Sequence, residues 1–377
     1  MTRRISITAP ALLLAAIFLA VPALARTKMT ALPERGRCVI RMDNPAATLI
    51  QEDRVLTLQK GKNNVDFSWN GVAVDPDSIR LEILSPKASV RLISVSYPPN
   101  ENALVWYVWS DAPAEARVRI AYLMAGIDGL AAYKGVLNEK ETGMDFSSFL
   151  VVRNFSGEDF AKARVVLPGA PAFERPIGHE ETVRRLVAEK ASVPVVKVWT
   201  FDAALLPWDP EKESGNVGIP VSYRAENTGA ALGGTPLQPG KVRLFQADGK
   251  GGTVFVGEDS TDFVPAGKPL SVTTGQSRDI VVTQRKMKED RINIRRNSGG
   301  GVVLYDTDEV ITAKVENFKD APAVLTLIQH IPGQWDMEEC NMDYVKKDSE
   351  TLEFTVRLAP RSKKELSMHY HRRNIRD

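Results

Sequence analysis

Short runs of alternating apolar and polar residues recur along most of this 377-residue chain. They cover 37–41, 55–58, 65–69, 79–83 and 90–95, and Pro, Gly, Asn or Asp residues bound them. Successive side chains of a β-strand point to opposite faces of the sheet, so a run of period two places its apolar residues on one face. Short strands at intervals of about 8–12 residues are typical of antiparallel sandwiches or barrels. The pattern predicts an all-β protein of two or three antiparallel, immunoglobulin-like β-sandwich domains with at most one short helix.

One run, 103–109, is apolar on both faces of a strand. Trp106 and Val108 would point one way, while Tyr107 and Trp109 would point the other. Such a strand is normally central and covered on both sides, because large aromatic side chains dominate core burial. A platform that stacks sugar rings is the alternative interpretation.

A single segment has helical periodicity. Val183, Leu186 and Val187 would share one face of a helix over 180–190. Two Glu/Arg pairs spaced four residues apart would support this helix. Because a stretch rich in Pro and Gly precedes it, we expect a linker or helix insertion near 168–194.

The turns around Asn154 and Asn317 resemble each other. Both segments read as strand, Asn at a turn, strand and then Pro-Gly, and the spacing from Asn154 to Pro168 nearly equals that from Asn317 to Pro332. Asn tolerates left-handed backbone geometry and caps its own turn. The repetition predicts two sandwich domains of similar build. We expect these segments: a signal peptide over 1–25, an N-terminal β domain over 26–115, a middle β-sandwich over 116–235 and a C-terminal β-sandwich over 236–377.

Residues 1–25 have the features of a secretory signal. Arg3 and Arg4 give a positive start, an apolar stretch covers 11–24, and a small-x-small pattern predicts a mature chain that begins at Arg26. An uncleaved anchor is the alternative, but the unbroken apolar run has only eleven residues, whereas a helix needs about 20 to span a membrane. The sequence therefore predicts export to the periplasm or the cell surface, by the general route rather than the twin-arginine route.

Charge narrows the range of partners. Cleavage would remove two of the 49 basic residues and leave 47 basic and 47 acidic side chains. A neutral chain has no global field for nucleic acid or anionic membrane. No later segment approaches 18 consecutive apolar residues, so we expect no transmembrane segment in the mature chain. A protein or polysaccharide of the envelope is the expected partner.

The two cysteines are Cys38 and Cys340. An oxidising compartment permits a disulfide between them, which would close a loop of about 300 residues. Two separate buried thiols, each packed as a small apolar side chain, are the alternative.

The mature segment resembles a bacterial family known as domain of unknown function 4139, whose longer relatives carry the name mucoidy inhibitor A. The resemblance extends over most of the mature chain and rests on the order of these segments: 56–61, 72–79, 121–126, 154–159, 201–203, 208–210, 219–227, 237–245, 255–259, 315–317 and 331–335. It implies a mostly β chain that is often exported, with no established activity and no agreed catalytic residues. This chain lacks the helical coiled-coil segment of the longer relatives, and their name refers to a surface polysaccharide phenotype.

Motifs for catalysis are missing from the sequence. There is no Gly-x-Ser-x-Gly nucleophile elbow, and the His179-Glu180 pair is followed by Val183 where a zinc-protease helix needs a second His. The glycine-rich run 297–301 lacks the Lys and Ser/Thr of a phosphate-binding loop and is read as a hairpin loop. Glu338 and Glu339 are adjacent, so on a strand they would face opposite sides rather than flank a glycosidic bond. We expect no cofactor.

Two groups of side chains have ligand-like spacing. His369 and His371 lie two residues apart, so on a strand both would point to one face and could hold a transition metal with a third ligand. An exposed edge is the alternative for them. The acidic run 306–309 could offer oxygens to calcium, but it lacks calcium-loop spacing and is read as a charged turn.

A basic cluster lies within 284–296, where six cations stand against Glu289 and Asp290 for a local charge of +4. Its cations are Arg285, Lys286, Lys288, Arg291, Arg295 and Arg296. Such a patch could bind an anionic envelope polymer or a partner. The alternation over 291–295 fits the solvated face of a hairpin equally well.

Two functional hypotheses follow from these observations. The first is an exported, non-enzymatic β-sandwich protein of the bacterial envelope that binds a partner through exposed strands or the 284–296 hairpin. The second is a hydrolase of envelope glycan or peptide, with a site assembled from distant residues, because such sites are recognised by geometry and not by sequence order.

Overall fold

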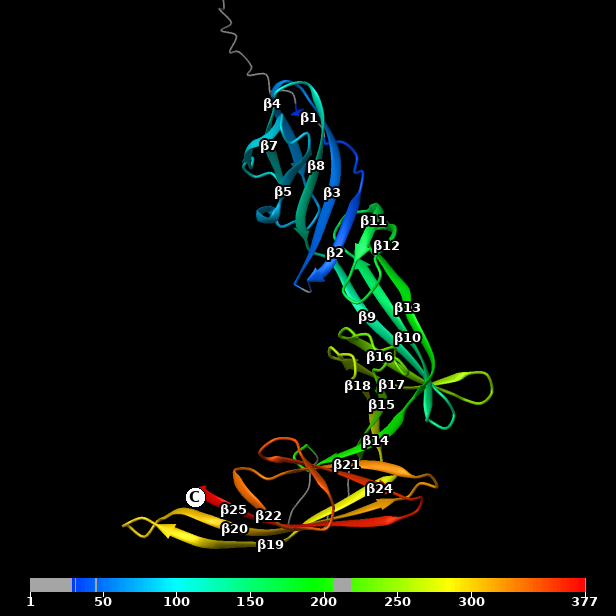
Figure 1. Ribbon diagram of the computed structural model, residues 1–377, viewed down its shortest axis with the longest axis vertical. Helices are drawn as coiled ribbons and strands as arrows, with labels where there is room; N and C mark the ends of the chain where they lie inside the picture. Colours follow the sequence, from blue (N-terminus) through cyan, green and yellow to red (C-terminus); the bar gives the residue numbers. More distant parts are fainter. Residues whose placement is uncertain (1–28, 31, 45, 206–217, 377) are drawn as a thin grey trace, which may run out of the picture. The chain divides into compact units, whose positions relative to one another are not determined.

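The computed structural model describes residues 29–30, 32–44, 46–205 and 218–376 (Figure 1). Nearly all elements are β-strands, and the only helical turn of the described part is the three-residue 3-10 helix η1 (Pro76–Ser78). The expected all-β class is confirmed. None of the helical structure in these ranges is long and apolar enough to cross a membrane. The expected signal peptide, 1–25, lies outside the described residues.

The chain forms two compact units that alternate along the sequence. The N-terminal unit holds the described residues up to Arg37 together with Glu52–Gly71 and Ile79–Ala121. The second unit holds Cys38–Gln51, Val72–Ser78 and the described residues from Tyr122 onward. Strands β3 (Ala47–Leu58) and β8 (Ala114–Met124) are therefore each divided between the units.

A four-stranded sheet is the main element of the N-terminal unit. Its strand order is β1 (Met29–Thr30), β4 (Gly61–Ser68), β7 (Ala103–Ser110) and β6 (Val90–Ser96). Strand β5 (Arg80–Ser85) pairs with β8. The aromatic run over 103–109 forms β7, and Trp106, which is 2% exposed, packs on Phe67 with ring centroids 5.5 Å apart. The predicted core position is confirmed for the face of Trp106 and Val108, whereas Tyr107 and Trp109 on the opposite face are only half-buried, so the strand is not covered on both sides.

Four groups of strands build the second unit. Neighbours in the first are β12 (Phe173–Ile177), β11 (Phe160–Val166), β2 (Cys38–Asn44) and β3. The second has the order β13 (Glu181–Pro194), β10 (Gly143–Asn154), β9 (Ile127–Leu137), β16 (Gly240–Ala247) and β17 (Thr253–Thr261). The third has the order β18 (Pro269–Ser277), β15 (Ile219–Glu226), β14 (Val196–Asp202), β21 (Ala323–His330), β24 (Thr351–Leu358) and β23 (Tyr344–Lys346). The fourth has the order β19 (Ile280–Arg296), β20 (Val302–Asn317), β25 (Lys363–Arg376) and β22 (Gln334–Cys340).

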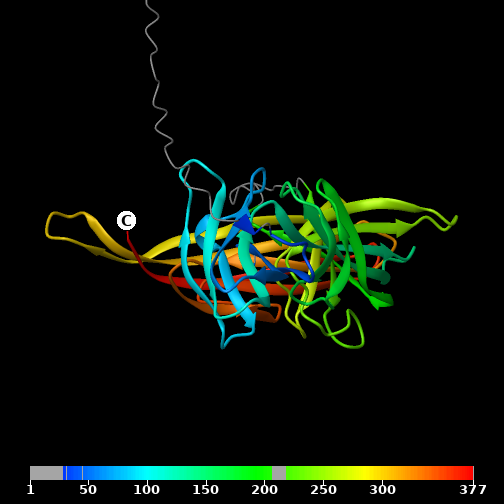
Figure 2. The same ribbon diagram turned by 90° about the horizontal axis from the view of Figure 1, so that it is seen from above.

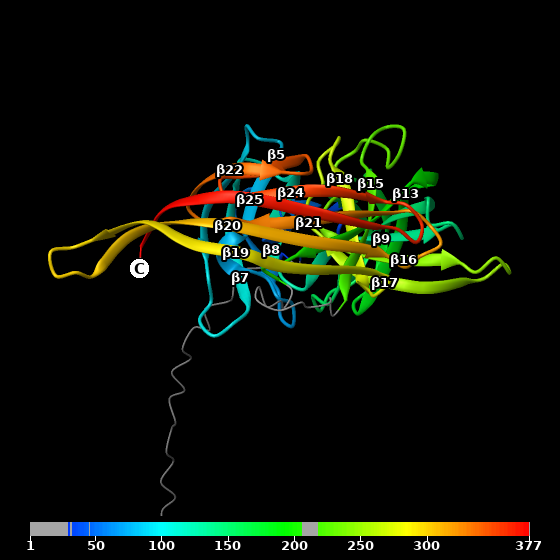
Figure 3. The ribbon, with the colours of Figure 1, turned by 90° about the horizontal axis from the view of Figure 1, so that it is seen from below.

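Two apolar cores of the second unit share the strand β15. Its residues Tyr223 and Ala225 belong to a core with residues of β9 and β10, while Ile219 and Val221 belong to the core of the C-terminal sandwich. In that sandwich β19, β20 and β25 lie side by side (Figure 3). Figure 2 shows the tip of the β19–β20 hairpin projecting beyond the C-terminal end of β25.

Most strand pairs are antiparallel, as expected, but some pairs of the described strands are parallel. They include β1–β4, β2–β11, β9–β16 and β14–β21. A parallel pair cannot be joined by a tight hairpin, so each of these pairs brings together strands that are separated by other elements. The alternating pattern predicts strands without predicting which distant strand lies beside them.

The prediction of a helix over 180–190 is wrong. This segment forms most of β13, which pairs antiparallel with β10 from Glu181 to Pro194. The guanidinium of Arg184 lies 3.8 Å from the ring centre of Phe149, and Leu186, expected on the buried helical face, is 44% exposed. Each helical ion pair adds only about 0.2–0.5 kcal/mol, so a ladder of backbone hydrogen bonds to a long neighbouring strand outweighs the local helical signal.

A buried asparagine recurs where a strand ends in a turn. Asn154 ends β10, Asn317 ends β20, and Asn227 follows β15. All three are at most 2% exposed. Each amide nitrogen donates to two or three backbone carbonyl oxygens of neighbouring turns. The sequence predicts two of these turns, and the structure adds the third.

Candidate functional site

The basic cluster of 284–296 lies on β19, whose pairing with β20 forms the projecting hairpin. Its turn is closed by Asn297, which donates its backbone N–H to Gly301 at 2.9 Å and accepts two backbone N–H groups on its side chain, so the predicted hairpin loop is confirmed. Arg285, Arg295 and Arg296 are exposed. The hairpin therefore presents cations at its surface, although several of them have partners within the sheet.

Acidic side chains of β20 pair with two of the six cations of this cluster. Lys288 donates to Asp308 at 2.6 Å, and Lys286 lies 3.7 Å from Glu309. The guanidinium of Arg291 lies 4.3 Å from the ring centre of Tyr305. These contacts leave less positive charge free than the sequence count of +4 suggests. The binding role of the hairpin stays a prediction.

The two histidines of β25 face the acidic residues of β20. His369 Nε2 lies 2.6 Å from Asp308, and His371 Nε2 lies 3.7 Å from Asp306. Hydrogen bonds from Lys288 and His369 lower the pKa of Asp308, and bonds from the Asn374 backbone and from Asn293 lower that of Asp306. The acidic run thus belongs to the middle of a strand, and not to the expected turn. The described residues contain no group of three or more side chains arranged to hold a metal ion.

A second polar group occupies the other face of the same strands. The Glu309 carboxylate is buried and accepts hydrogen bonds from Thr307 at 2.7 Å and Tyr370 at 3.0 Å. Burial alone would raise the pKa of Glu309, but these bonds and the charges of Lys286 and Arg372 lower it overall. Since its members satisfy one another, this network stabilises the sheet rather than offering a vacant ligand position.

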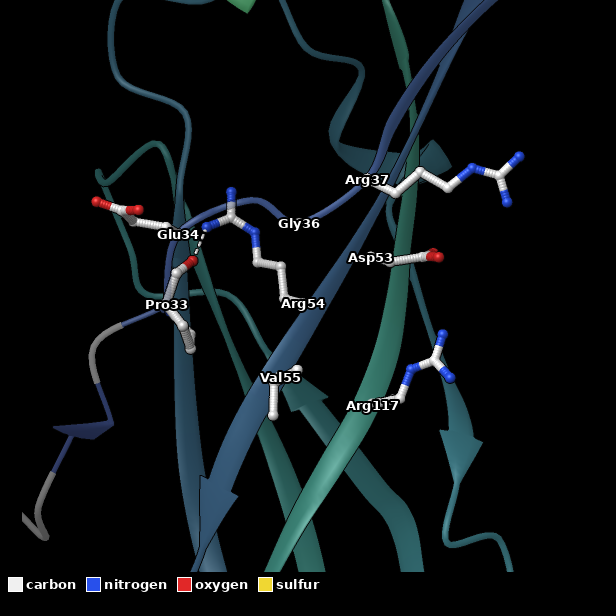
Figure 4. A pocket seen from close by; sticks show the side chains of 8 residues that line it. All are labelled: Pro33, Glu34, Gly36, Arg37, Asp53, Arg54, Val55 and Arg117. Carbon is white, nitrogen blue, oxygen red and sulfur yellow. Dashed lines mark hydrogen bonds between the residues drawn. The ribbon is translucent and has the colours of Figure 1, made fainter. Parts of the chain in front are cut away.

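An arginine pocket lies in the N-terminal unit (Figure 4). It has a volume of about 430 Å³ and is lined by the segment before β2 and by β3 and β8. Asp53 accepts two hydrogen bonds from Arg119 at 2.8 and 3.2 Å, and this contact raises the pKa of Arg119. Behind it, the fully buried Glu52 accepts hydrogen bonds from Arg35 and Arg54.

Two further arginines of this pocket have no such partner. Within the described residues, no hydrogen bond or ion pair joins the guanidinium of Arg37 or Arg117 to another group, and both side chains are exposed. Figure 4 shows them extending to the same side as the Asp53 carboxylate, which lies between them. No local sequence motif predicts this pocket, because its residues come from three separate segments.

An apolar groove of about 500 Å³ lies on the face of β9, β10 and β13 in the second unit. Small side chains, among them Ala131, Ser148 and Ala188, form part of its lining. Tyr133 stacks on Phe146 at 5.6 Å and donates its hydroxyl to the Gln238 carbonyl at 2.8 Å, and burial raises its pKa to about 12. The groove has the size of a small-molecule site, yet the tyrosine hydroxyl that it offers is already satisfied.

The edge strand β6 of the N-terminal unit has an unusual exposure pattern. It ends its sheet and pairs with β7, where Leu92 lies opposite Val108 and Val95 opposite Trp106. Opposed residues of antiparallel strands share a face, and these two β7 residues are buried, so Leu92 and Val95 face the core side. They are nevertheless 40% and 44% exposed. No described part of the chain therefore covers the core side of this sheet at β6.

The rest of this edge carries a third exposed apolar side chain and a single charge. Ile93, at a register shift between the two strands, is 53% exposed. The single charged residue of β6 is Arg91, whose guanidinium lies 5.6 Å from the ring centre of Trp109. In contrast, the edge strand β13 carries five exposed or half-exposed charged residues, as most natural edges do. They are Glu181, Arg184, Arg185, Glu189 and Lys190. The pattern over 90–95 predicts this strand, but it contains no signal that the strand is an edge.

The cysteines lie in different sheets. Cys38 is 4% exposed in β2, and Cys340 is half-buried in β22. The Cys340 thiol donates a hydrogen bond to the Met342 carbonyl at 3.2 Å, and burial raises its pKa. Both residues are free thiols in this structure. The disulfide between them stays a prediction.

The chain is thus a β-sandwich protein with three candidate binding surfaces: the apolar edge of β6, the arginine pocket and the apolar groove. No model of a known protein family and no curated protein matches the sequence. The resemblance to domain of unknown function 4139 therefore stays a prediction.

Proposed function

We propose that this chain is an exported, non-enzymatic binding protein of the bacterial cell envelope that recruits an extended strand of a protein partner to the edge of β6. The observation that carries the proposal is the exposure of Leu92 and Val95 on the core-facing side of an edge strand. Natural proteins normally cover or charge such edges, because an open edge offers unpaired N–H and C=O groups to any other strand. An apolar, nearly uncharged edge therefore suits a surface that is covered by a partner.

A protein strand fits this edge better than a polysaccharide does. A peptide can continue the backbone ladder and place alternate side chains over the core side, as in other cases of strand addition. A glycan has no ladder of amide groups to offer. The basic hairpin is a weaker candidate, because acidic side chains of its own sheet pair with Lys286 and Lys288.

The expected affinity is moderate. Full burial of an aliphatic side chain contributes about 1.5–3 kcal/mol, and Leu92, Ile93 and Val95 have roughly half of their surface left to bury, which gives about 3 kcal/mol in total. About four new backbone hydrogen bonds would add about 1 kcal/mol each. Because association costs at least about 4 kcal/mol, the edge alone supports a transient complex, and tighter binding needs contacts beyond β6.

Export is the second part of the proposal. It rests on the positive start, the apolar stretch and the small-x-small pattern of residues 1–25. The resemblance to a family that is often exported agrees with it. N-terminal sequencing of the protein recovered from the envelope fraction is expected to begin at Arg26. A cytoplasmic chain that still carries the segment 1–25 would contradict this part of the proposal.

Site-specific photo-crosslinking tests the binding role. A photoreactive amino acid at position 93 of the full chain, in intact cells, is expected to give a specific protein adduct. Position 254 on β17 is the matched control, because Val254 and Ile93 are both 53% exposed apolar residues of edge strands. The Val95→Arg variant is expected to abolish the adduct while leaving the thermal unfolding transition unchanged, since Val95 is 44% exposed. Equal adducts at both positions, or an adduct that still forms in the Val95→Arg variant, would contradict the proposal.

A further inference from the structure

We infer that the arginine pocket of the N-terminal unit binds an oxyanion, a carboxylate or a phosphate group, between the guanidinium groups of Arg37 and Arg117. This site is separate from the β6 edge and does not depend on the proposed strand addition. It would give the protein a second ligand of a different chemical class.

The charge balance of the pocket favours an anion. Its lining and the ion pairs behind it contain five arginines and three acidic residues, which leaves an excess of two positive charges. Asp53, the acidic residue between the two guanidinium groups of the proposed site, has both oxygens engaged by another arginine. The buried Glu52 is shared between two further arginines, and Figure 4 shows the Glu34 carboxylate on the opposite side of the pocket. The charges of Arg37 and Arg117 are therefore left for a ligand.

The backbone holds both arginines in place. Gly36 donates its N–H to the Asp53 carbonyl at 2.9 Å, and Asp53 donates to the Arg37 carbonyl at 2.8 Å, so the segment before β2 is fixed against β3. Arg117 lies on β8 between two fully buried neighbours, and its side chain therefore points to the outer face. Figure 4 shows both guanidinium groups on one side of the pocket. Because the backbone is already fixed, a ligand has to order only the two arginine side chains when it binds.

The chemistry of arginine sets the ligand class. A guanidinium group offers paired N–H donors whose spacing matches two oxygens of a carboxylate or phosphate, whereas a neutral sugar would leave both charges without a counterion. The pocket of about 430 Å³ is open enough for the acidic group of a larger molecule as well as for a free ion. Carboxylate and phosphate share this recognition, so two probes are needed to distinguish them.

The test is isothermal titration of the mature full chain with inorganic phosphate and, separately, with an oligogalacturonate as the carboxylate probe. The unaltered protein is expected to bind at least one probe. The double variant Arg37→Gln, Arg117→Gln is expected to bind it about four- to twenty-five-fold more weakly, since each exposed ion pair contributes about two- to fivefold. The matched control is Arg357→Gln, which removes an exposed arginine of β24 and is expected to leave the affinity unchanged.

A variant that is expected to bind the probe more tightly distinguishes a change at the site from a loss of folding. Asp53→Asn removes the carboxylate between the two arginines and frees Arg119, so it is expected to raise the affinity by about two- to fivefold. Tighter binding of phosphate would identify a phosphate site, and tighter binding of the oligogalacturonate a carboxylate site. Failure of both probes at millimolar concentration, or equal weakening by Arg357→Gln and the double variant, would overturn the inference.

Discussion

Replacing Asn317 with alanine is expected to destabilise the C-terminal sandwich by about 3 kcal/mol. The Asn317 amide nitrogen donates to the carbonyls of Ala321 and Ala359 at 2.9 Å each, and its oxygen accepts the Lys319 N–H at 3.0 Å. The residue is 2% exposed, so water cannot replace these bonds. A net contribution of about 1 kcal/mol for each of the three hydrogen bonds gives this estimate, before the cost of burying unpaired carbonyl groups.

Asn341 provides the matched control for this substitution. It also makes side-chain hydrogen bonds to the backbone, donating to the Glu365 carbonyl at 3.0 Å and accepting the Ser367 N–H at 2.9 Å. Because Asn341 is exposed, water can satisfy the same groups after Asn341→Ala. This control is therefore expected to cost less than about 1 kcal/mol.

The assay must report on one sandwich, because a chain of several domains need not unfold in a single step. Hydrogen exchange of peptides from β20 and β24, measured across a urea series, gives the local free energy of unfolding. Asn317→Ala is expected to lower that energy by about 2 kcal/mol more than Asn341→Ala does. Equal losses in the two variants would refute the claim that the recurring asparagine holds its turns.

Three more predictions concern stability. Asp306, Asp308 and Glu309 all have lowered pKa values in the folded state. Their contribution to the free energy of unfolding is therefore present above about pH 5 and is lost as the pH falls below about 4. Urea unfolding across pH 3–7 should show this loss of stability, and a stability that does not change with pH would contradict it. A Cβ at Gly240 would clash with the Ala131 carbonyl oxygen, whereas one at Gly229 would meet nothing within 4 Å, so Gly240→Ala should cost about 1–3 kcal/mol in chemical denaturation and Gly229→Ala little. Lys286→Glu would place a carboxylate beside the buried Glu309 and should destabilise the C-terminal sandwich by about 3 kcal/mol; Arg285→Glu, which alters the exposed neighbour, should be nearly neutral in the same assay.

The strands were predictable because their signal is local. Alternation over a few residues and the turn residues between them identify β4, β5, β6 and β7 without any knowledge of the partner strand. The buried position of Trp106 follows from the same pattern. The segment of β13 shows the limit, because the spacing of Val183, Leu186 and Val187 fits a helix while the long neighbouring strand β10 imposes a β conformation.

The candidate sites were much less predictable. The sequence identifies the cations of 284–296 but not the acidic side chains of β20 that pair with them, since the register of two strands is a tertiary property. Arg37 and Arg117 lie far apart in the sequence and carry no motif. β6 is an edge strand because only one strand pairs with it, and the strand pairing cannot be read from a single sequence.

Amide hydrogen exchange on the photo-crosslinked complex tests the central claim most directly. The adduct formed at position 93 would be purified, and its exchange compared with that of the protein alone. Strand addition is expected to slow exchange across Val90–Ser96, because the amides of the outer edge gain hydrogen-bond partners, while the β19–β20 hairpin is unchanged. Unchanged exchange in β6, with protection elsewhere in the chain, would contradict the account and place the binding surface outside this edge.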